Sequence, residues 1–275
     1  MALETDLFIF SDEFGSELQH KSVRNVRDYI RKIRGFRSVT IVERNINFGL
    51  ARSIIDGVTA VLSNYRRIIV LEDDMVTSPY FLTYMNEALE MYEDNDRVIS
   101  IHGYVYPVEQ RLPDIFFLPG ADCWGWATWK RGWACFNGDG QFLLDELNRR
   151  KLTDAFDFNG AYPYTRMLEN QIAGKNDSWA IRWYASAFLA GKLTLYPGRS
   201  LVNNIGNDNS GTHCGDSTEL GVELSSQRVN LDNITIESSK EGMQAVEAFL
   251  RRRLSLLGIG RRVARKAMDI TKGWK

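Results

Sequence analysis

Three consecutive carboxylates, Glu72, Asp73 and Asp74, directly follow an apolar run at residues 68–71. An unbroken apolar run of this length predicts a strand covered on both faces, which places the three carboxylates at its carboxyl end. Adjacent carboxylates repel one another and are best tolerated where solvent or a divalent cation compensates their charge. A cation that bridges a diphosphate is one such arrangement. Taken alone, the triplet also fits a solvated turn before a helix, or a phosphoacceptor or phosphatase site.

Two earlier strands are also predicted to end in segments that suit ligand binding. An apolar run at residues 7–10 ends at Asp12, and a second run at 39–42 leads through Asn47 and Gly49 into an amphipathic helix. Strand and helix alternate three times, which predicts half of a doubly wound α/β sheet with right-handed crossovers. Ligands bind outside the carboxyl ends of the strands in such sheets, so these segments and the acidic triplet are expected to converge.

The overall composition narrows the class of protein. The chain has 275 residues, of which 44% are hydrophobic, and a formal net charge of −1. These values predict one globular domain with a sizeable core and give no basis for nucleic-acid binding. The three cysteines lack CxxC spacing, which argues against a zinc site and a disulfide framework and favours a reducing compartment. The N-terminus is acidic where a secretory signal is basic, and no stretch approaches the roughly 20 apolar residues of a membrane span.

Several segments resemble one known family in their order along the chain. Residues 47–51 (NFGLA) and 68–75 (IIVLEDDM) resemble the DxD region of GT-A-fold glycosyltransferases, closest to bacterial family 2-type sugar transferases and the related N-acetylglucosaminyltransferase I. The resemblance continues through residues 116–120, 124–129, 177–179, 201–206 and 212–213. Ordered matches over roughly residues 6 to 214 are far more specific than any single motif.

This resemblance implies a fold and a division of the chain. It implies a Rossmann-like, mostly parallel central sheet flanked by helices, with a smaller mixed subregion on the acceptor side. Residues 1–97 would form the half that binds the nucleotide-sugar donor. Residues 98–235 would form the acceptor-binding and catalytic half of the same domain. Residues 236–275 would form a basic, helical C-terminal tail.

The resemblance also assigns the metal and the donor. Asp74 would ligate Mn²⁺ or Mg²⁺, while Glu72 and Asp73 would hold the ribose and the donor sugar. His213 matches a further metal ligand of the family and favours manganese, which accepts imidazole more readily than magnesium does; a surface loop histidine is the alternative. Asp12 matches the residue that binds the nucleobase of a UDP-sugar, with an ordinary turn or N-cap aspartate as the alternative.

A transfer with inversion needs a base beside the acceptor hydroxyl. By resemblance that base is Asp177, although either Asp177 or Ser178 could instead cap the following helix.

The tryptophans and one arginine extend the expected site. Sugar rings stack on indoles, so we expect Trp124 and Trp126 at the junction of donor and acceptor, and Trp129 and Trp133 in the core. Arg52, at the start of the second helix, is expected near a phosphate at that helix N-terminus, or else on the surface.

The end of the chain is strongly basic. Residues 250–275 carry nine Lys or Arg residues against one Asp, with Leu254, Leu257 and Val263 between them. Such a tail suits peripheral contact with anionic lipid at the inner face of the membrane, and therefore a lipid-linked acceptor. A solvated or disordered tail is the alternative. We accordingly expect a cytoplasmic protein.

The leading interpretation is an inverting, metal-dependent glycosyltransferase that moves a sugar from a UDP-sugar to a saccharide or lipid-linked saccharide in surface polysaccharide biosynthesis. By the resemblance, relatives begin with an extra strand and helix before the segment matching residues 7–12, and we expect this sequence to lack that unit, either because its start is misplaced or because the protein is truncated. In the second case the alternative function is a truncated, catalytically impaired remnant that binds sugar or metal, or the partner of a complete transferase. A nucleotidyl- or phosphotransferase fits less well, because no glycine-lysine phosphate loop follows the first strand.

Overall fold

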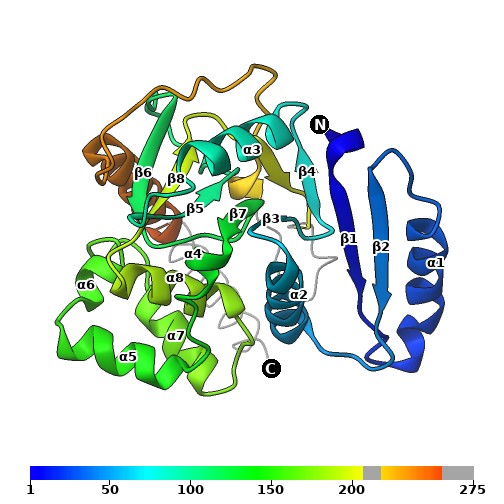
Figure 1. The fold of residues 1–275 in the computed structure, drawn as a ribbon. Helices are drawn as coiled ribbons and strands as arrows, with labels where there is room; N and C mark the ends of the chain where they lie inside the picture. Colours follow the sequence, from blue (N-terminus) through cyan, green and yellow to red (C-terminus); the bar gives the residue numbers. More distant parts are fainter. Residues whose placement is uncertain (207–217, 256–275) are drawn as a thin grey trace, which may run out of the picture.

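The protein has a mixed α/β fold, as predicted. The computed structural model describes residues 1–206 and 218–255 (Figure 1). Within them, one five-stranded sheet and two two-stranded sheets are surrounded by helices. His213, predicted as a metal ligand, and residues 256–275 of the predicted tail lie outside this range.

The five-stranded sheet is mixed, with the strand order β3-β7-β5-β8-β6. Its strands are β3 (Arg67–Val70), β5 (Val98–His102), β6 (Ile115–Pro119), β7 (Trp126–Trp129) and β8 (Leu193–Pro197). Only β5 and β8 pair in parallel, whereas β7 is antiparallel to β3 and β5, and β6 is antiparallel to β8. The prediction of a mostly parallel central sheet is therefore wrong. A continuous apolar strand reveals that both of its faces are buried, but not the direction in which it runs.

The first two strands form a separate parallel pair. Strand β1 (Asp6–Ser11) pairs in parallel with β2 (Ser38–Glu43), and the helix α1 (His20–Ile30) connects the two strands. In the described part of the chain, β1 pairs only with β2 and β3 only with β7. In the described sheets β1 and β3 therefore each keep one edge without a strand partner.

Helix α2 (Leu50–Asn64) joins the two sheets (Figure 1). The ring of Phe10 on β1 packs directly against Gly57 of this helix. On the other side, Val58 and Leu62 share a core cluster with Val70 of β3. Strands β1 and β3 are therefore linked by packing against a common helix, and not by backbone hydrogen bonds to each other.

The remaining elements cover the central sheet. Helix α3 (Phe81–Met91) contacts one side of the sheet, and the helices of residues 130–189 lie on the other side (Figure 1). These are α4 (Lys130–Trp133), α5 (Gly140–Arg149), α6 (Thr153–Phe156), α7 (Tyr164–Ile172) and α8 (Trp179–Leu189). Strands β4 (Met75–Thr77) and β9 (Val202–Asn204) form an antiparallel pair that brings residues 202–206 to the acidic triplet.

The described part of the predicted tail belongs to the folded core. Residues 240–255 are helical, and Val246, Phe249 and Leu250 are buried in the cluster that includes Phe116. The prediction of a peripheral tail therefore now concerns only residues 256–275, which lie outside the described residues. No described helix combines the length and the apolar character needed to cross a membrane.

Candidate functional site

The acidic triplet forms the turn between β3 and β4. Asp73 is exposed, while Glu72 and Asp74 are partly buried. Burial, followed by the negative charges of Asp74 and Asp73, raises the pKa of Glu72 to about 7. Burial and the charge of Asp73 also raise the pKa of Asp74. The structure thus brings together carboxylates that resist ionisation in the absence of a compensating positive charge.

The surroundings of Asp74 fit a bound cation. Its Oδ1 atom is buried and has no hydrogen-bond partner among the described residues. Residues 204–206 line its other side: the backbone N–H of Ile205 donates to the Asp74 carbonyl at 2.9 Å, and the side chain of Asn204 bonds to its carboxylate. A Cβ atom at Gly206 would lie only 2.4 Å from Asp74 Oδ2. Burying a charged oxygen without a partner is costly, and a hard divalent cation would satisfy it.

The described part of the chain does not by itself contain a full set of metal ligands. No group of three or more His, Cys, Asp or Glu side chains is arranged there to hold a metal ion. The contribution predicted for His213 falls outside that part. If a cation binds at this place, Asp74, with Glu72 beside it, is the described side chain that could hold it.

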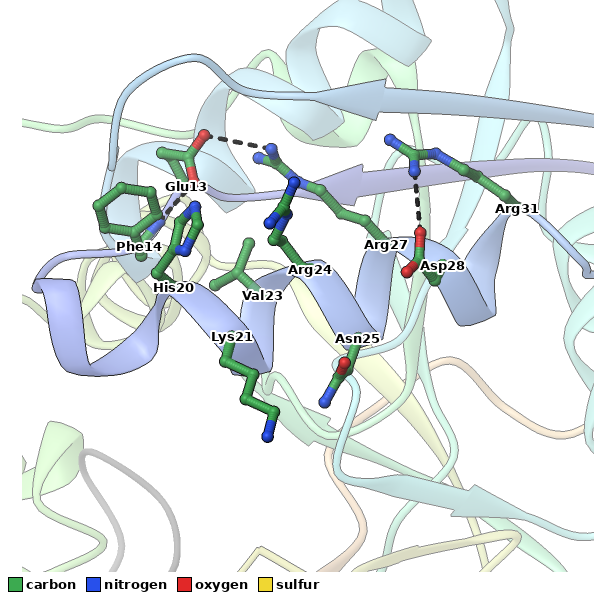
Figure 2. A pocket seen from close by; sticks show the side chains of 10 residues that line it. All are labelled: Glu13, Phe14, His20, Lys21, Val23, Arg24, Asn25, Arg27, Asp28 and Arg31. Carbon is green, nitrogen blue, oxygen red and sulfur yellow. Dashed lines mark hydrogen bonds and ion pairs between the residues drawn. The ribbon is translucent and has the colours of Figure 1, made fainter.

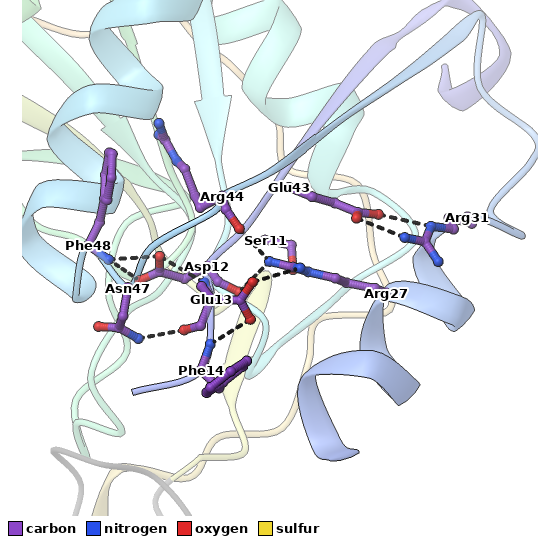
Figure 3. Close-up of polar contacts among 10 residues, drawn as sticks. All are labelled: Ser11, Asp12, Glu13, Phe14, Arg27, Arg31, Glu43, Arg44, Asn47 and Phe48. Carbon is purple, nitrogen blue, oxygen red and sulfur yellow. Dashed lines mark hydrogen bonds and ion pairs between the residues drawn. The ribbon is translucent and has the colours of Figure 1, made fainter. Parts of the chain in front are cut away.

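Asp12 organises the turn that precedes α2. Its carboxylate accepts the backbone N–H groups of Phe48 at 2.8 Å and Gly49 at 2.9 Å, as Figure 3 shows for Phe48. Asn47 Nδ2 donates to the carbonyl of Glu13 at 2.6 Å in the same network. Asp12 therefore makes the contacts of a turn aspartate, the alternative noted above. A nucleobase that reached it would share these acceptor oxygens.

Arg27 of α1 is a structural residue of this site that the sequence did not reveal. Its guanidinium donates to Ser11 Oγ at 3.3 Å and to the carbonyls of Asp12 at 3.2 Å and Arg44 at 2.8 Å, and it pairs with Glu13 (Figure 3). It thereby ties the carboxyl ends of β1 and β2 together. The only available signal was a basic residue on the inward side of an amphipathic helix.

Phe48 lies between two arginines at the start of α2. The guanidinium carbons of Arg44 and Arg52 lie 4.3 and 3.9 Å from the centroid of its ring. Arg52 is exposed, and its first-turn position puts its charge beside the helix N-terminus. Both features favour an anion such as a phosphate.

The structure separates Asp177 from the capping role. Ser178 is the N-cap of α8, and its Oγ accepts the backbone N–H of Ile181 at 3.2 Å. Asp177 is 59% exposed and lies 3.8 Å from Arg182. Its Oδ2 atom is also 3.9 Å from the position that a Cβ would take at Gly49. Asp177 thus lies beside the turn that Asp12 organises, with its carboxylate accessible.

The two tryptophans predicted to stack on sugar occupy different environments. Trp126 has no exposed surface and packs against Trp133, Trp179 and Trp183, so the prediction that it contacts a sugar is wrong. It lies on β7, where side chains on both faces of the sheet are covered. Trp124 is only partly buried, in the loop before that strand. Trp129 and Trp133 are buried, in agreement with their predicted packing role.

The loop that carries Trp124 also contains a carboxylate missed in the sequence. Asp122 and Cys123 precede Trp124, and burial, then the charges of Asp122, Glu72 and Asp74, raise the pKa of the Cys123 thiol. The contacts agree that the loop lies near the acidic triplet, because a Cβ at Gly125 would lie 3.4 Å from Cδ2 of Leu71, the residue before Glu72. A lone aspartate in an aromatic segment was the only indication in the sequence.

A separate cavity of about 500 Å³ lies beside α1 (Figure 2). It is lined largely by residues of that helix, including Arg24 and Arg27, and by Arg31 just after it. Of the residues discussed above, it shares only Glu13 and Arg27, and its lining does not include the acidic triplet.

A comparison with known proteins adds no family assignment. No protein-family model matches the chain, and no curated protein is significantly similar to it.

Proposed function

We propose that the protein is an inverting, metal-dependent glycosyltransferase of the GT-A type that uses a UDP-sugar. The observation that carries this proposal is the buried Oδ1 of Asp74, which has no hydrogen-bond partner among the described residues and lies beside the partly buried Glu72. Around it, Asn47 to Arg52 and the loop of Trp124 follow the ends of other strands, where α/β sheets bind ligands. A divalent cation held by Asp74 would neutralise the departing diphosphate as a Lewis acid.

The described residues have separate tasks in this proposal. Arg52 and the N-terminus of α2 attract the diphosphate, because both present positive charge to it. Asp177 takes the proton of the acceptor hydroxyl as that oxygen attacks the anomeric carbon. Since Ser178 caps α8, the Asp177 carboxylate is not bound by the helix N-terminus, and its exposed side chain, 3.8 Å from Arg182, is accessible to an acceptor. The acceptor proposed from the sequence is a saccharide, free or lipid-linked.

The direct test is release of UDP from a panel of UDP-sugars in the presence of Mn²⁺, with saccharide acceptors or water. Wild-type protein should release UDP, and addition of EDTA should abolish the release. Asp74→Asn should be inactive, whereas Asp114→Asn, at an exposed position away from the triplet, should behave as wild type. A folded wild-type sample that turns over none of the donors would count decisively against the proposal.

A second candidate is a binding protein without turnover. The observation that favours it is the missing pairing between β1 and β3 in the described sheets, which leaves Asp12 and the acidic triplet on separate sheets. It predicts that UDP-sugars bind but that no UDP is released, and that Asp177→Asn changes nothing measurable.

A further inference from the structure

The loop at residues 120–125 is fixed at the carboxyl end of β5. The backbone N–H of Trp124 donates to His102 Nε2 at 3.1 Å, and the N–H of Gly103 donates to the Gly125 carbonyl at 2.7 Å. Gly120 and Gly125 bound the loop with positive φ angles of 84° and 64°. The aromatic rings of Trp124 and Tyr104 also hold the loop in place, because they pack edge to face with centroids 4.8 Å apart. Asp122 is therefore presented by a built loop.

The carboxylate of Asp122 has one satisfied and one poorly satisfied oxygen. Oδ1 accepts the N–H of Cys123 at 2.8 Å. Among the described residues, Oδ2 is approached by the hydroxyl of Tyr196 at 3.4 Å and His102 Nδ1 at 3.9 Å, and the Cys123 thiol also bonds to the carboxylate. The side chain is 26% exposed, so a ligand can reach it. A partly buried charge with such weak donors favours additional hydroxyl or N–H partners.

His102 supplies independent evidence that this place is arranged for a ligand. It is completely buried, and burial lowers its pKa, which keeps the imidazole neutral. Because Nε2 accepts the Trp124 N–H, the hydrogen is assigned to Nδ1. Nδ1 makes no hydrogen bond of ordinary geometry among the described residues, although the Tyr104 carbonyl acts on it as a backbone acceptor and Asp122 Oδ2 lies 3.9 Å away. A buried, weakly satisfied donor thus lies beside the Asp122 carboxylate.

The hydroxyl of Tyr196 contacts the same carboxylate, and two further phenols lie close enough to be affected by its charge. The hydroxyls of Tyr106 and Tyr164 lie 3.5 Å apart. The negative charge of Asp122 contributes, after burial, to raising the pKa of both phenols and of Tyr196. A carboxylate among phenols, with a partly exposed indole beside it, offers both hydrogen bonds and apolar ring faces. Sugar rings require this combination, since they present hydroxyls at their edges and C–H groups on their faces.

We propose that Asp122 and Trp124 form the subsite that holds the sugar ring of the UDP-sugar, with Asp122 Oδ2 accepting ring hydroxyls and His102 acting as a positioning residue. This inference rests on the proposed function. The donor ring is favoured over the acceptor because the loop contacts the strand end that carries the acidic triplet: a Cβ at Gly125 would lie 3.4 Å from Cδ2 of Leu71, the residue directly before Glu72. The ligand class is a hexosyl or N-acetylhexosaminyl group with free hydroxyls.

The test compares the affinities for UDP and for UDP-sugars by calorimetry with Mn²⁺ present. In Asp122→Asn, we expect the affinity for UDP to stay within about twofold, while that for UDP-glucose or UDP-N-acetylglucosamine falls about tenfold, as for loss of one charge-assisted hydrogen bond. Asp114→Asn is the matched control and should change neither. His102→Gln, which can still accept the Trp124 N–H, should retain more sugar affinity than His102→Leu.

Several outcomes would overturn the subsite. These are an unchanged affinity for both sugars in Asp122→Asn, an equal loss of UDP and UDP-sugar binding, or a loss of turnover alone, which would make Asp122 a base. If Asp122→Asn does not fold, Asp122→Glu displaces the charge and should show the same selective loss. If wild-type protein binds no UDP, the proposed function fails, and saturation-transfer NMR with glucose and N-acetylglucosamine decides the subsite: contact that Asp122→Asn loses supports it, and no contact overturns it.

Discussion

The Asp12 carboxylate accepts the backbone N–H of Gly49 at 2.9 Å and so links the end of β1 to the start of α2. It also accepts the N–H of Phe48, so both donors lose their partner when the carboxylate is removed. The strand order makes this contact more important for holding β1 in place. In the described sheets, β1 has no other strand beside it than β2.

Replacement of Asp12 by Ala should therefore destabilise the fold as well as weaken donor binding. Loss of a comparable capping side chain costs about 0.5–2 kcal/mol in the free energy of unfolding. Asp12→Asn should lose less, because the amide keeps one acceptor oxygen. Urea unfolding of both variants measures the difference, and equal stability of Asp12→Ala and wild type would show that the turn does not depend on this contact.

Asp177 and Ser178 are adjacent, but substitution of the first should affect turnover and substitution of the second should affect stability. Asp177→Asn should reduce turnover by about 10²–10⁴-fold, the usual contribution of a general base, without lowering the free energy of unfolding. Ser178→Ala should cost about 1 kcal/mol in stability, because Ile181 loses its cap, and should leave more turnover than Asp177→Asn. UDP-release kinetics and urea unfolding on the same samples separate the two effects. A stability loss in Asp177→Asn that matches that of Ser178→Ala would mean that Asp177 is structural.

The acidic triplet predicts how stability depends on pH. The pKa of Glu72 in the folded protein is raised to about 7 from an ordinary value of 4.5. Between these two pH values the folded state keeps a proton that the unfolded state has lost, so metal-free stability should fall as pH rises from about 4.5 to 7. The expected loss is at most about 3 kcal/mol. The raised pKa of Asp74 acts in the same direction.

A divalent cation should reverse this trend, because it favours the ionised carboxylates. Urea unfolding at pH 5 and pH 8 should therefore show a larger stabilisation by Mn²⁺ at pH 8. Glu72→Gln serves as the control, since it removes the titrating group and should flatten the metal-free dependence. An equally steep fall of stability in Glu72→Gln would locate its origin elsewhere.

The sequence predicted where polar residues gather better than how they are connected. The run before Glu72 identified both a buried strand and its carboxyl end, and the structure places the triplet there. The apolar run of β6 gave no information on strand direction, because antiparallel and parallel strands can both be covered on two faces. The antiparallel course of β6 and β7 follows from long-range pairing that a local pattern does not contain.

The roles of single residues within the site were harder to predict, again because they depend on contacts that a local pattern does not contain. Trp124 and Trp126 are two positions apart and looked equivalent, yet one is partly exposed in a loop and the other is the centre of a tryptophan cluster. For Asp177 and Ser178 the sequence left two possible caps, which only the hydrogen bond to Ile181 distinguishes. Asp122 and His102 meet across 20 residues of chain, so their proximity depends on the fold.

Gly206 offers a way to disturb Asp74 without touching its charge. A Cβ atom at this position would lie 2.4 Å from Asp74 Oδ2 and 2.9 Å from Asp74 Cβ, so Gly206→Ala must push the aspartate aside. We expect Mn²⁺ affinity to fall about 10–100-fold, the usual effect of disturbing the support of a ligand. Gly138→Ala is the matched control, because its Cβ would meet nothing closer than 3.8 Å. Manganese titration followed by electron paramagnetic resonance measures both variants. If Gly206→Ala binds Mn²⁺ as wild type does while its thermal unfolding is unchanged, Asp74 is not the principal ligand, and the cation site must be sought at other carboxylates.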